Sequence, residues 1–343
     1  MIYPAGAPVE AVEFFVDYQR VGRLTVPPWR LEVDVGQENR AHRLEAVAYP
    51  SGGEPVSAGL ETAAIAVHGE VDVRLQQLYV TVTRGGERAL DLQRGDFTVR
   101  DGGREQEIET FARGDIPFSA AVLVDSSGSM VAGRLETALA GVRVFAERIQ
   151  PLDQVKLVVF SHRRLRETPF TNLASLLVLG SEGRSASGGT ALNDMLFLAL
   201  KRLEGQKGRR VVLLLSDGVD VNSVVDIDDI ARAARRLGAL IYWVRLPFQE
   251  GAIQSIWRDS QAHKRQRDGL TAAVRASGGR EIPVHDAQAV QPAFAEILAE
   301  LRQQYVFGYQ PQPRPPSGRW RQVKVRVRGP GLDVRAPTGY VAP

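Results

Sequence analysis

The chain has 343 residues, of which 44% are hydrophobic, and it lacks any apolar run of about 18 residues that could span a membrane. The formal net charge is only +3, and the 43 Lys and Arg residues are spread along the chain, which argues against nucleic-acid binding. Cysteine is absent, so disulfides, thiol catalysis and thiolate metal sites are excluded. We expect a soluble chain of two or three domains, each able to bury a core.

Residues 1–67 are predicted to form a β unit. Segments 12–17, 28–35 and 43–49 are rich in residues that favour strands, and a turn follows at 50–53. They resemble the strands of bacterial immunoglobulin-like domains, although the unit is about one strand short of a complete sandwich. This is expected if the chain begins inside the domain. The absence of a signal peptide pattern at its start is then weak evidence about location.

Two flanking stretches, 68–115 and 305–343, show strand patterns of a second kind. Residues 80–83 and 97–99 alternate and lead into glycine-containing hairpin turns, and residues 305–309 and 322–328 alternate in the same way. Neither flank has enough strands for a stable sheet structure of its own. We therefore expect both flanks to form one composite β-sandwich, with the segment between them inserted into it.

The inserted segment, 116–304, alternates between strands and helices. Strands are predicted at 120–124, 155–160, 210–216, 239–246 and 280–284, and helices at 135–149, 191–204, 226–237, 269–277 and 287–304. Residues 164–170 follow the preceding strand too closely for a crossover helix, which favours an antiparallel edge strand. The pattern predicts an α/β doubly wound, Rossmann-like sheet of about six strands, mostly parallel.

Polar residues follow the buried strands of this segment. The string DSSGS at 125–129 places hydroxyl and carboxylate side chains two residues apart, so that they can converge on one cation. Such a string is also common at helix N-termini and turns. A second string, SGGT, ends at Thr190, and a third, LSDG, contains Asp217. Because loops at the carboxyl ends of parallel strands converge, one oxygen cluster is expected from Asp125, Ser127, Ser129, Thr190 and Asp217. Hard oxygen ligands favour Mg²⁺ over Zn²⁺.

The motifs DSSGS, GGT and LSDG, in this order after apolar strands, resemble the metal-ion-dependent adhesion site of von Willebrand factor type A domains. The resemblance implies that Ser127, Ser129 and Thr190 bind a divalent cation through hydroxyls, and that Asp125 and Asp217 act mostly through water. Mg²⁺ is expected, with Mn²⁺ or Ca²⁺ as alternatives. It also implies an open coordination position, which a Glu or Asp carboxylate of a protein partner fills.

The whole arrangement resembles the bacterial von Willebrand factor A-related proteins, best known from Acidobacteria. The segments that carry this resemblance are GDFTVRDGG, GYQP and PTGYV in the flanks. It implies an exported protein in the periplasm, at the cell surface or outside the cell. Residues 247–268, including Trp257 and the basic stretch 263–267, are longer than the usual connection. We interpret them as a solvated loop or short helix, with a docking surface as the alternative.

Further residues near the motifs allow two interpretations. Asp194 can support the metal ligands from behind, or it can stabilise the N-terminus of its helix. Asp220 is interpreted as a turn residue or a charge at the rim, and Met130 as a packing residue. The five His residues are interpreted as surface or packing residues.

The preferred function is a metal-dependent protein-binding or adhesion module and not an enzyme, because the motif loops offer no His, Cys or Lys as a catalytic group. A metal-dependent hydrolase and a structural envelope spacer with a vestigial site remain alternatives. The sequence sets neither the identity of the partner nor the oligomeric state.

Overall fold

The computed structural model describes residues 8–35, 41–62, 75–114, 116–181, 185–247 and 260–342. The chain divides into two compact units, Met1–Asp72 and Val73–Pro343. The predicted boundary at residue 67 and Trp257 both lie outside the described residues. Within the described ranges, no helix has the length and apolar character needed to cross a membrane.

The described residues of the first unit form one antiparallel sheet in the order β2-β1-β3-β4. Its strands are β1 (Val9–Val16), β2 (Gln19–Leu24), β3 (Arg43–Pro50) and β4 (Val56–Glu61). The strand predicted at 28–35 is wrong, because this segment pairs with no strand and β2 occupies the edge of β1 instead. Leu31 lies against β2, since a Cβ at Gly22 would come within 2.5 Å of its Cδ2 atom. The segment therefore packs over the sheet and not within it.

The second unit is built around a six-stranded sheet in the order β12-β11-β10-β13-β14-β15. The strands are β10 (Phe118–Asp125), β11 (Gln154–Phe160), β12 (Arg164–Glu167), β13 (Arg209–Ser216), β14 (Leu240–Arg245) and β15 (Glu281–Pro283). All neighbours are parallel except β12, which confirms the predicted antiparallel edge strand. Every residue of β10 is buried, as expected for a parallel strand covered on both faces.

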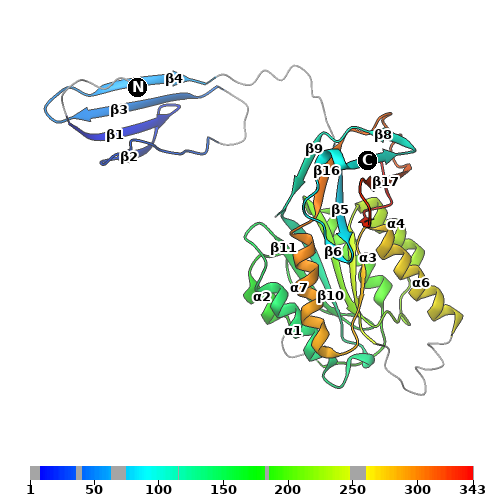
Figure 1. Ribbon diagram of the computed structural model, residues 1–343. Coiled ribbons are helices and arrows are strands. Elements are labelled where there is room, and N and C mark those ends of the chain that lie inside the picture. The colour runs from blue at the N-terminus through cyan, green and yellow to red at the C-terminus, as the bar shows by residue number, and fades with distance from the viewer. Residues whose placement is uncertain are drawn as a thin grey trace. The chain divides into compact units, whose positions relative to one another are not determined.

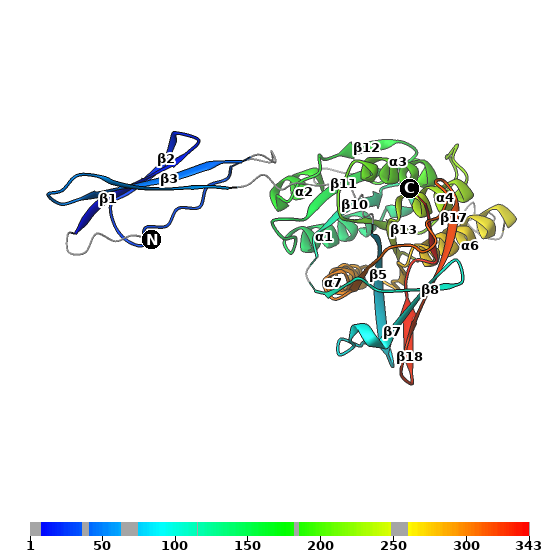
Figure 2. The ribbon, with the colours of Figure 1, turned by 90° about the horizontal axis from the view of Figure 1, so that it is seen from above.

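Helices cover both faces of this sheet. Residues of α1 (Arg134–Ala146), α2 (Ala174–Ser181) and α7 (Val290–Leu301) share one core, and residues of α3 (Leu192–Glu204), α4 (Ile227–Leu237) and α6 (Gln261–Ala276) share the other. Figure 2 shows the strands between α1 and α3. The sequence did not predict α2, and α6 begins at Gln261 and not at the predicted residue 269. The basic stretch 263–267 is therefore helical.

The two flanks pair with each other in two small sheets (Figure 1). In one sheet, β5 and β9 pair with β16, and β18 and β6 pair with β5; in the other, β17 pairs with β7 and β19, and β8 pairs with β7. Phe97 and Phe307 meet in the shared core at a centroid distance of 4.7 Å. The strands are β5 (Gln76–Arg84), β6 (Glu87–Arg88), β7 (Phe97–Asp101), β8 (Arg104–Gln106), β9 (Thr110–Arg113), β16 (Tyr305–Tyr309), β17 (Trp320–Val327), β18 (Leu332–Arg335) and β19 (Gly339–Val341).

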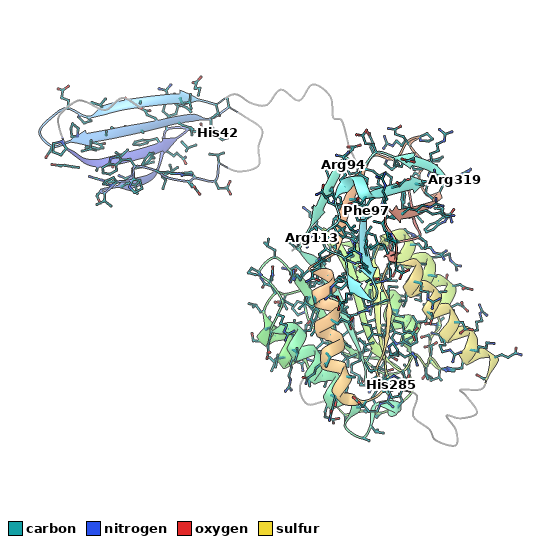
Figure 3. The ribbon with its side chains drawn as sticks, in the orientation of Figure 1. His42, Arg94, Phe97, Arg113, His285 and Arg319 are labelled. Carbon is teal, nitrogen blue, oxygen red and sulfur yellow. The ribbon has the colours of Figure 1, made fainter. Side chains whose placement is uncertain are left out.

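A buried polar network joins α7 to these flanking sheets. The carboxylate of Glu300 accepts hydrogen bonds from Tyr242 Oη at 2.6 Å and Thr81 Oγ1 at 3.2 Å, and it pairs with Arg335 Nη2 at 2.6 Å. Figure 3 shows Phe97 in the β portion and His285, which follows β15, at the opposite end of the unit. The carboxyl ends of the parallel strands thus face away from the flanking sheets.

Candidate metal centre

The first loop of the site follows β10. Asp125 is fully buried, and its Oδ1 atom accepts a hydrogen bond of 2.8 Å from the backbone N–H of Ser127. The hydroxyl oxygens of Ser127 and Ser129 lie 3.2 Å apart. A short 3-10 turn, η2 (Gly128–Met130), follows, and the buried side chain of Met130 anchors it. The two predicted hydroxyl ligands therefore lie side by side, one just before the turn and one within it.

The second loop, which contains SGGT, is hydrogen-bonded to the first. The N–H of Gly128 donates to the carbonyl of Gly188 at 2.8 Å, and the N–H of Ser187 donates to the carbonyl of Ser126 at 2.9 Å. Gly188 has a φ of +80°, a conformation in which a side chain is strained. A Cβ at Gly189 would come within 2.0 Å of Asn222 Oδ1, so a larger residue there would require the side chain of Asn222, in the loop after β13, to move.

The third loop, after β13, completes the arrangement. The backbone N–H groups of Val221 and Asn222 both donate to the carbonyl of Thr190 at 3.0 Å. Asp217 Oδ1 accepts from the N–H of Val219 at 3.1 Å, whereas its Oδ2 atom is buried and has no hydrogen-bond partner among the residues that the structure describes. The structure thus brings the three predicted motifs together at one edge of the sheet.

Two buried carboxylates interact electrostatically in this site. The hydroxyl of Ser216 donates to Asp125 Oδ2 at 2.7 Å and ties the ends of β10 and β13 together. The pKa of Asp125 is raised to about 7, chiefly by burial and then by the negative charge of Asp217. The hydrogen bonds from Ser127 and Ser216 offset only part of this effect. A cation between the carboxylates would stabilise their ionised forms.

The donor set fits a hard divalent cation. It combines the carboxylates of Asp125 and Asp217 with the hydroxyls of Ser127, Ser129 and Thr190, all of them oxygen ligands of the kind that Mg²⁺, Mn²⁺ and Ca²⁺ prefer. Within the described ranges, no three His, Cys, Asp or Glu side chains form a metal-binding group. This finding does not conflict with the site, because three of its five donors are hydroxyls. The all-oxygen donor set favours Mg²⁺, Mn²⁺ or Ca²⁺ over Zn²⁺, which prefers nitrogen and sulfur ligands.

The contacts of Asp194 do not match the predicted role of supporting the metal ligands. Its Oδ1 atom accepts hydrogen bonds from the backbone N–H groups of Val224 at 3.0 Å and Val225 at 2.9 Å. In the part of the chain that the structure describes, it makes no hydrogen bond with any of the five predicted ligands. Asp194 therefore anchors the loop after β13 onto α3, an interaction that the sequence did not predict.

Asp220 stabilises the N-terminus of α3 from a different loop. Its Oδ1 atom accepts from the backbone N–H of Leu192 at 2.8 Å and from the hydroxyl of Ser223 at 2.6 Å. The N-cap residue of α3 is Ala191, which has no side-chain acceptor of its own. Burial raises the pKa of Asp220, and its hydrogen bonds offset this only in part. The sequence interpretation as a rim charge missed this capping role.

His162 lies beside the second loop, a position that was not predicted from the sequence. Its ring is exposed, and a Cβ at Gly188 would come within 2.5 Å of its Nδ1 atom. The hydroxyl of Ser161 lies 3.3 Å from the same nitrogen. His162 follows β11 directly, so the rule that the carboxyl ends of parallel strands converge could have identified it.

Comparisons with known proteins agree with this architecture. Residues 120–219 match the model of the von Willebrand factor type A domain. An uncharacterized protein of Synechocystis, sll0103, is 27% identical over 124 residues, which cover 34% of this chain and 30% of that protein. The chain therefore matches less than a third of the length of this curated relative.

Several solved structures are also similar. The conserved hypothetical protein BatB from Bacteroides thetaiotaomicron has a TM-score of 0.41 at 18% identity, covering 53% of this chain and 98% of that one. A von Willebrand factor type A protein from Catenulispora acidiphila has a TM-score of 0.42 at 12% identity, covering 78% and 73%. The family match and the parallel sheet that carries its motifs lead to one conclusion: this chain contains a von Willebrand factor type A domain.

Proposed function

We propose that this chain is a protein-binding module that uses a divalent cation at the carboxyl edge of its parallel sheet. Asp125, Ser127, Ser129, Thr190 and Asp217 would hold the ion. A Glu or Asp carboxylate of a protein partner would fill the remaining coordination position. The observation that carries the proposal is the buried Oδ2 atom of Asp217, which lacks a hydrogen-bond partner among the described residues, in a site whose second carboxylate, Asp125, is itself fully buried.

The physical argument concerns charge. A buried carboxylate without a partner costs several kcal/mol, and a second one nearby adds repulsion. A divalent cation balances the two negative charges of Asp125 and Asp217, while the neutral hydroxyls complete part of its coordination shell. A metal held in this way can still attract a further anionic ligand. Mg²⁺ is the proposed ion, with Mn²⁺ or Ca²⁺ as alternatives.

A metal-dependent hydrolase is the second candidate, and one observation favours it. His162 is exposed beside Gly188, next to the hydroxyl of Ser161, so an imidazole is available at the edge of the site. Purified protein would be assayed on phosphate, ester and peptide substrates with and without EDTA. Metal-dependent turnover that is lost in His162→Ala would favour the hydrolase over the binding module.

The remaining domains are proposed to position this site. The strands of 68–115 and 305–343 would act as one β-sandwich that carries the inserted domain, and the first unit would be an immunoglobulin-like spacer. Export to the periplasm, the cell surface or the exterior is proposed from the resemblance to bacterial von Willebrand factor A-related proteins. Fractionation of the native cells, with the protein found only in the cytosol, would contradict export.

The central test is metal-dependent stabilisation. Mg²⁺ at about 100 times its dissociation constant should stabilise the folded chain by about 2.7 kcal/mol, seen as a rise in Tm. Asp125→Ala should abolish this rise, whereas the matched control Asp228→Ala, on the exposed side of α4, should retain it. A Tm that does not respond to Mg²⁺, Mn²⁺ or Ca²⁺ in the unmodified protein would contradict the proposal and favour a vestigial site.

A further inference from the structure

Arg134 is a half-buried cation without a carboxylate partner among the described residues. It is the first residue of α1, five positions after Ser129. Its Nη2 atom donates to the carbonyl of Pro247 at 2.6 Å, and no ion pair accompanies this hydrogen bond in the described ranges. By contrast, Arg302, Arg321 and Arg335 each pair with a buried carboxylate. Arg134 therefore has donors that the described part of the chain does not satisfy with negative charge.

The guanidinium lies at the same edge of the sheet as the metal ligands. Pro247 follows Leu246, whose N–H donates to the carbonyl of Ser216 at 3.1 Å, directly before Asp217. Burial lowers the pKa of Arg134, and the charges of Asp217 and Asp125 act in the opposite direction, so both carboxylates are close enough to influence it. Once a divalent cation balances those carboxylates, the positive charge of Arg134 remains available for another anion.

Exposed valines belong to the same loops. Val131, Val221 and Val224 are 43%, 50% and 94% exposed. Val131 precedes Ala132, which has a φ of +59°, and such a left-handed conformation costs a non-glycine residue about 1 kcal/mol. Val221 Cγ2 would lie 3.2 Å from a Cβ at Gly189, which places it beside the second loop. The loops around the site therefore expose apolar surface next to a positive centre.

The acidic residues of the rim, Asp194 and Asp220, accept hydrogen bonds from the protein itself. Asp194 accepts hydrogen bonds from two backbone N–H groups, and Asp220 accepts one from a backbone N–H and one from a hydroxyl. The Oδ1 atom of each carboxylate is therefore engaged by the protein itself. Arg134 supplies a positive charge without a carboxylate partner among the described residues, and the exposed valines belong to the same loops.

We propose that Arg134 binds the partner's carboxylate together with the metal ion, and that this carboxylate is flanked by apolar side chains that pack on Val131, Val221 and Val224. The partner is thus an extended protein segment with an acidic residue between apolar neighbours. This inference rests on the proposed function and adds specificity to it. A guanidinium presents parallel N–H donors that match a carboxylate, so Arg134 also sets the orientation of the segment.

Two short synthetic peptides test the inference in the full-length protein with Mg²⁺. One has Glu between leucines (acetyl-Ser-Leu-Glu-Leu-Ser-amide), and the other has Glu between serines. We expect the leucine peptide to bind about tenfold more tightly in calorimetry, because burial of its side chains contributes apolar area. Replacement of Glu by Gln in the leucine peptide should abolish binding.

Variants separate the contributions. Arg134→Gln should weaken binding of both Glu peptides about tenfold, as expected for loss of a charge-assisted hydrogen bond, and Arg134→Lys should restore part of it. The double variant Val221→Ser, Val224→Ser should remove the preference for leucine while the serine peptide binds as before. In all of these variants the rise of Tm with Mg²⁺ should persist, which shows that the metal site and the fold are intact.

The outcomes distinguish this inference from the proposed function. If Mg²⁺ stabilises the protein but neither peptide binds, or if both bind equally, the inference is wrong and the metal site stands. Unchanged binding in Arg134→Gln would also overturn it. If Mg²⁺ fails to stabilise the unmodified protein, the proposed function itself is wrong.

Discussion

Buried carboxylates occur in two regions of the second unit, and they have different partners in the two regions. In the β portion, Asp101 accepts hydrogen bonds from Tyr309 and Tyr340 and pairs with Arg321 at 2.7 Å. At the edge of the parallel sheet, Asp125 is stabilised only by neutral donors, and Asp217 keeps one oxygen without a partner in the described ranges. Asp101 thus has a charged partner, whereas Asp125 and Asp217 have no ion pair among the described residues, and we propose that an external cation takes this role.

The pKa shifts follow the same contrast. Burial pushes the pKa of Glu300 upward, but the guanidinium of Arg335 and the hydrogen bonds to the carboxylate outweigh it, so the pKa is lowered. The pKa of Asp125 is raised to about 7 by burial and by Asp217. Burial alone therefore does not decide the direction of the pKa shift. The pKa rises at Asp125, where no ion pair compensates for burial, and falls at Glu300, where Arg335 does.

The largest expected effect on stability comes from a variant that breaks the polar network around Glu300. Glu300→Gln removes the negative charge that balances Arg335 and should destabilise the chain by about 3–5 kcal/mol, measured by urea unfolding without metal. Asp217→Asn removes a like charge from beside Asp125 and should cause no comparable loss under the same conditions. Equal losses in the two variants would show that the two regions do not differ in the way described.

An intermediate effect concerns pH. In the metal-free protein, the folded pKa of Asp125 is about 7, whereas the unfolded chain has about 3.9. The folded state therefore holds a proton between these values that the unfolded state has lost, so stability should fall as pH rises from about 4 to about 7, by at most about 1.4 kcal/mol per unit. Saturating Mg²⁺ or Asp125→Asn should remove this slope. A slope that survives in Asp125→Asn belongs to another group.

The smallest expected effect tests whether Asp194 anchors the loop after β13. Asp194→Ala removes the acceptor for the N–H groups of Val224 and Val225 and should cost about 1 kcal/mol of stability. Because Asp194 makes no hydrogen bond with the predicted ligands in the described ranges, the Mg²⁺ concentration at half-maximal stabilisation should stay the same. A marked weakening of Mg²⁺ binding would restore Asp194 to a role behind the metal ligands.

The sequence predicted the features that depend on local pattern. The strands β10 and β13 are runs of apolar residues because helices cover both faces, and the polar loops after them follow from parallel topology. The order of the three motifs then placed the five oxygen donors at one edge. Strand periodicity also predicted β5, β7, β16 and β17 in the flanks, because alternation is a property of a few consecutive residues, whereas the shorter flanking strands were not predicted.

The missed features depend on distant residues. Asp101 contacts Tyr309 and Tyr340, more than 200 positions later, and no local spacing links them. The capping of α3 by Asp220 also joins separate loops. The sequence did not predict that α6 begins at Gln261, because the first turns of this helix are mainly charged and polar. The wrong strand at 28–35 has apolar alternation, but it pairs with no strand, and Leu31 lies against Gly22 of β2 instead.

The position of Asp125 at the end of β10 has a mechanical consequence. The other end of this strand leads back towards β9 in the flanking sheet, so one strand runs from the β portion of the unit to the proposed metal site. Tension from a partner held at the site would pull along β10. Its ladders with β11 and β13, on both sides, would then bear the force in shear, with many hydrogen bonds loaded at once. A tether anchored in this way resists extraction better than one anchored in a loop, whose bonds would break one after another.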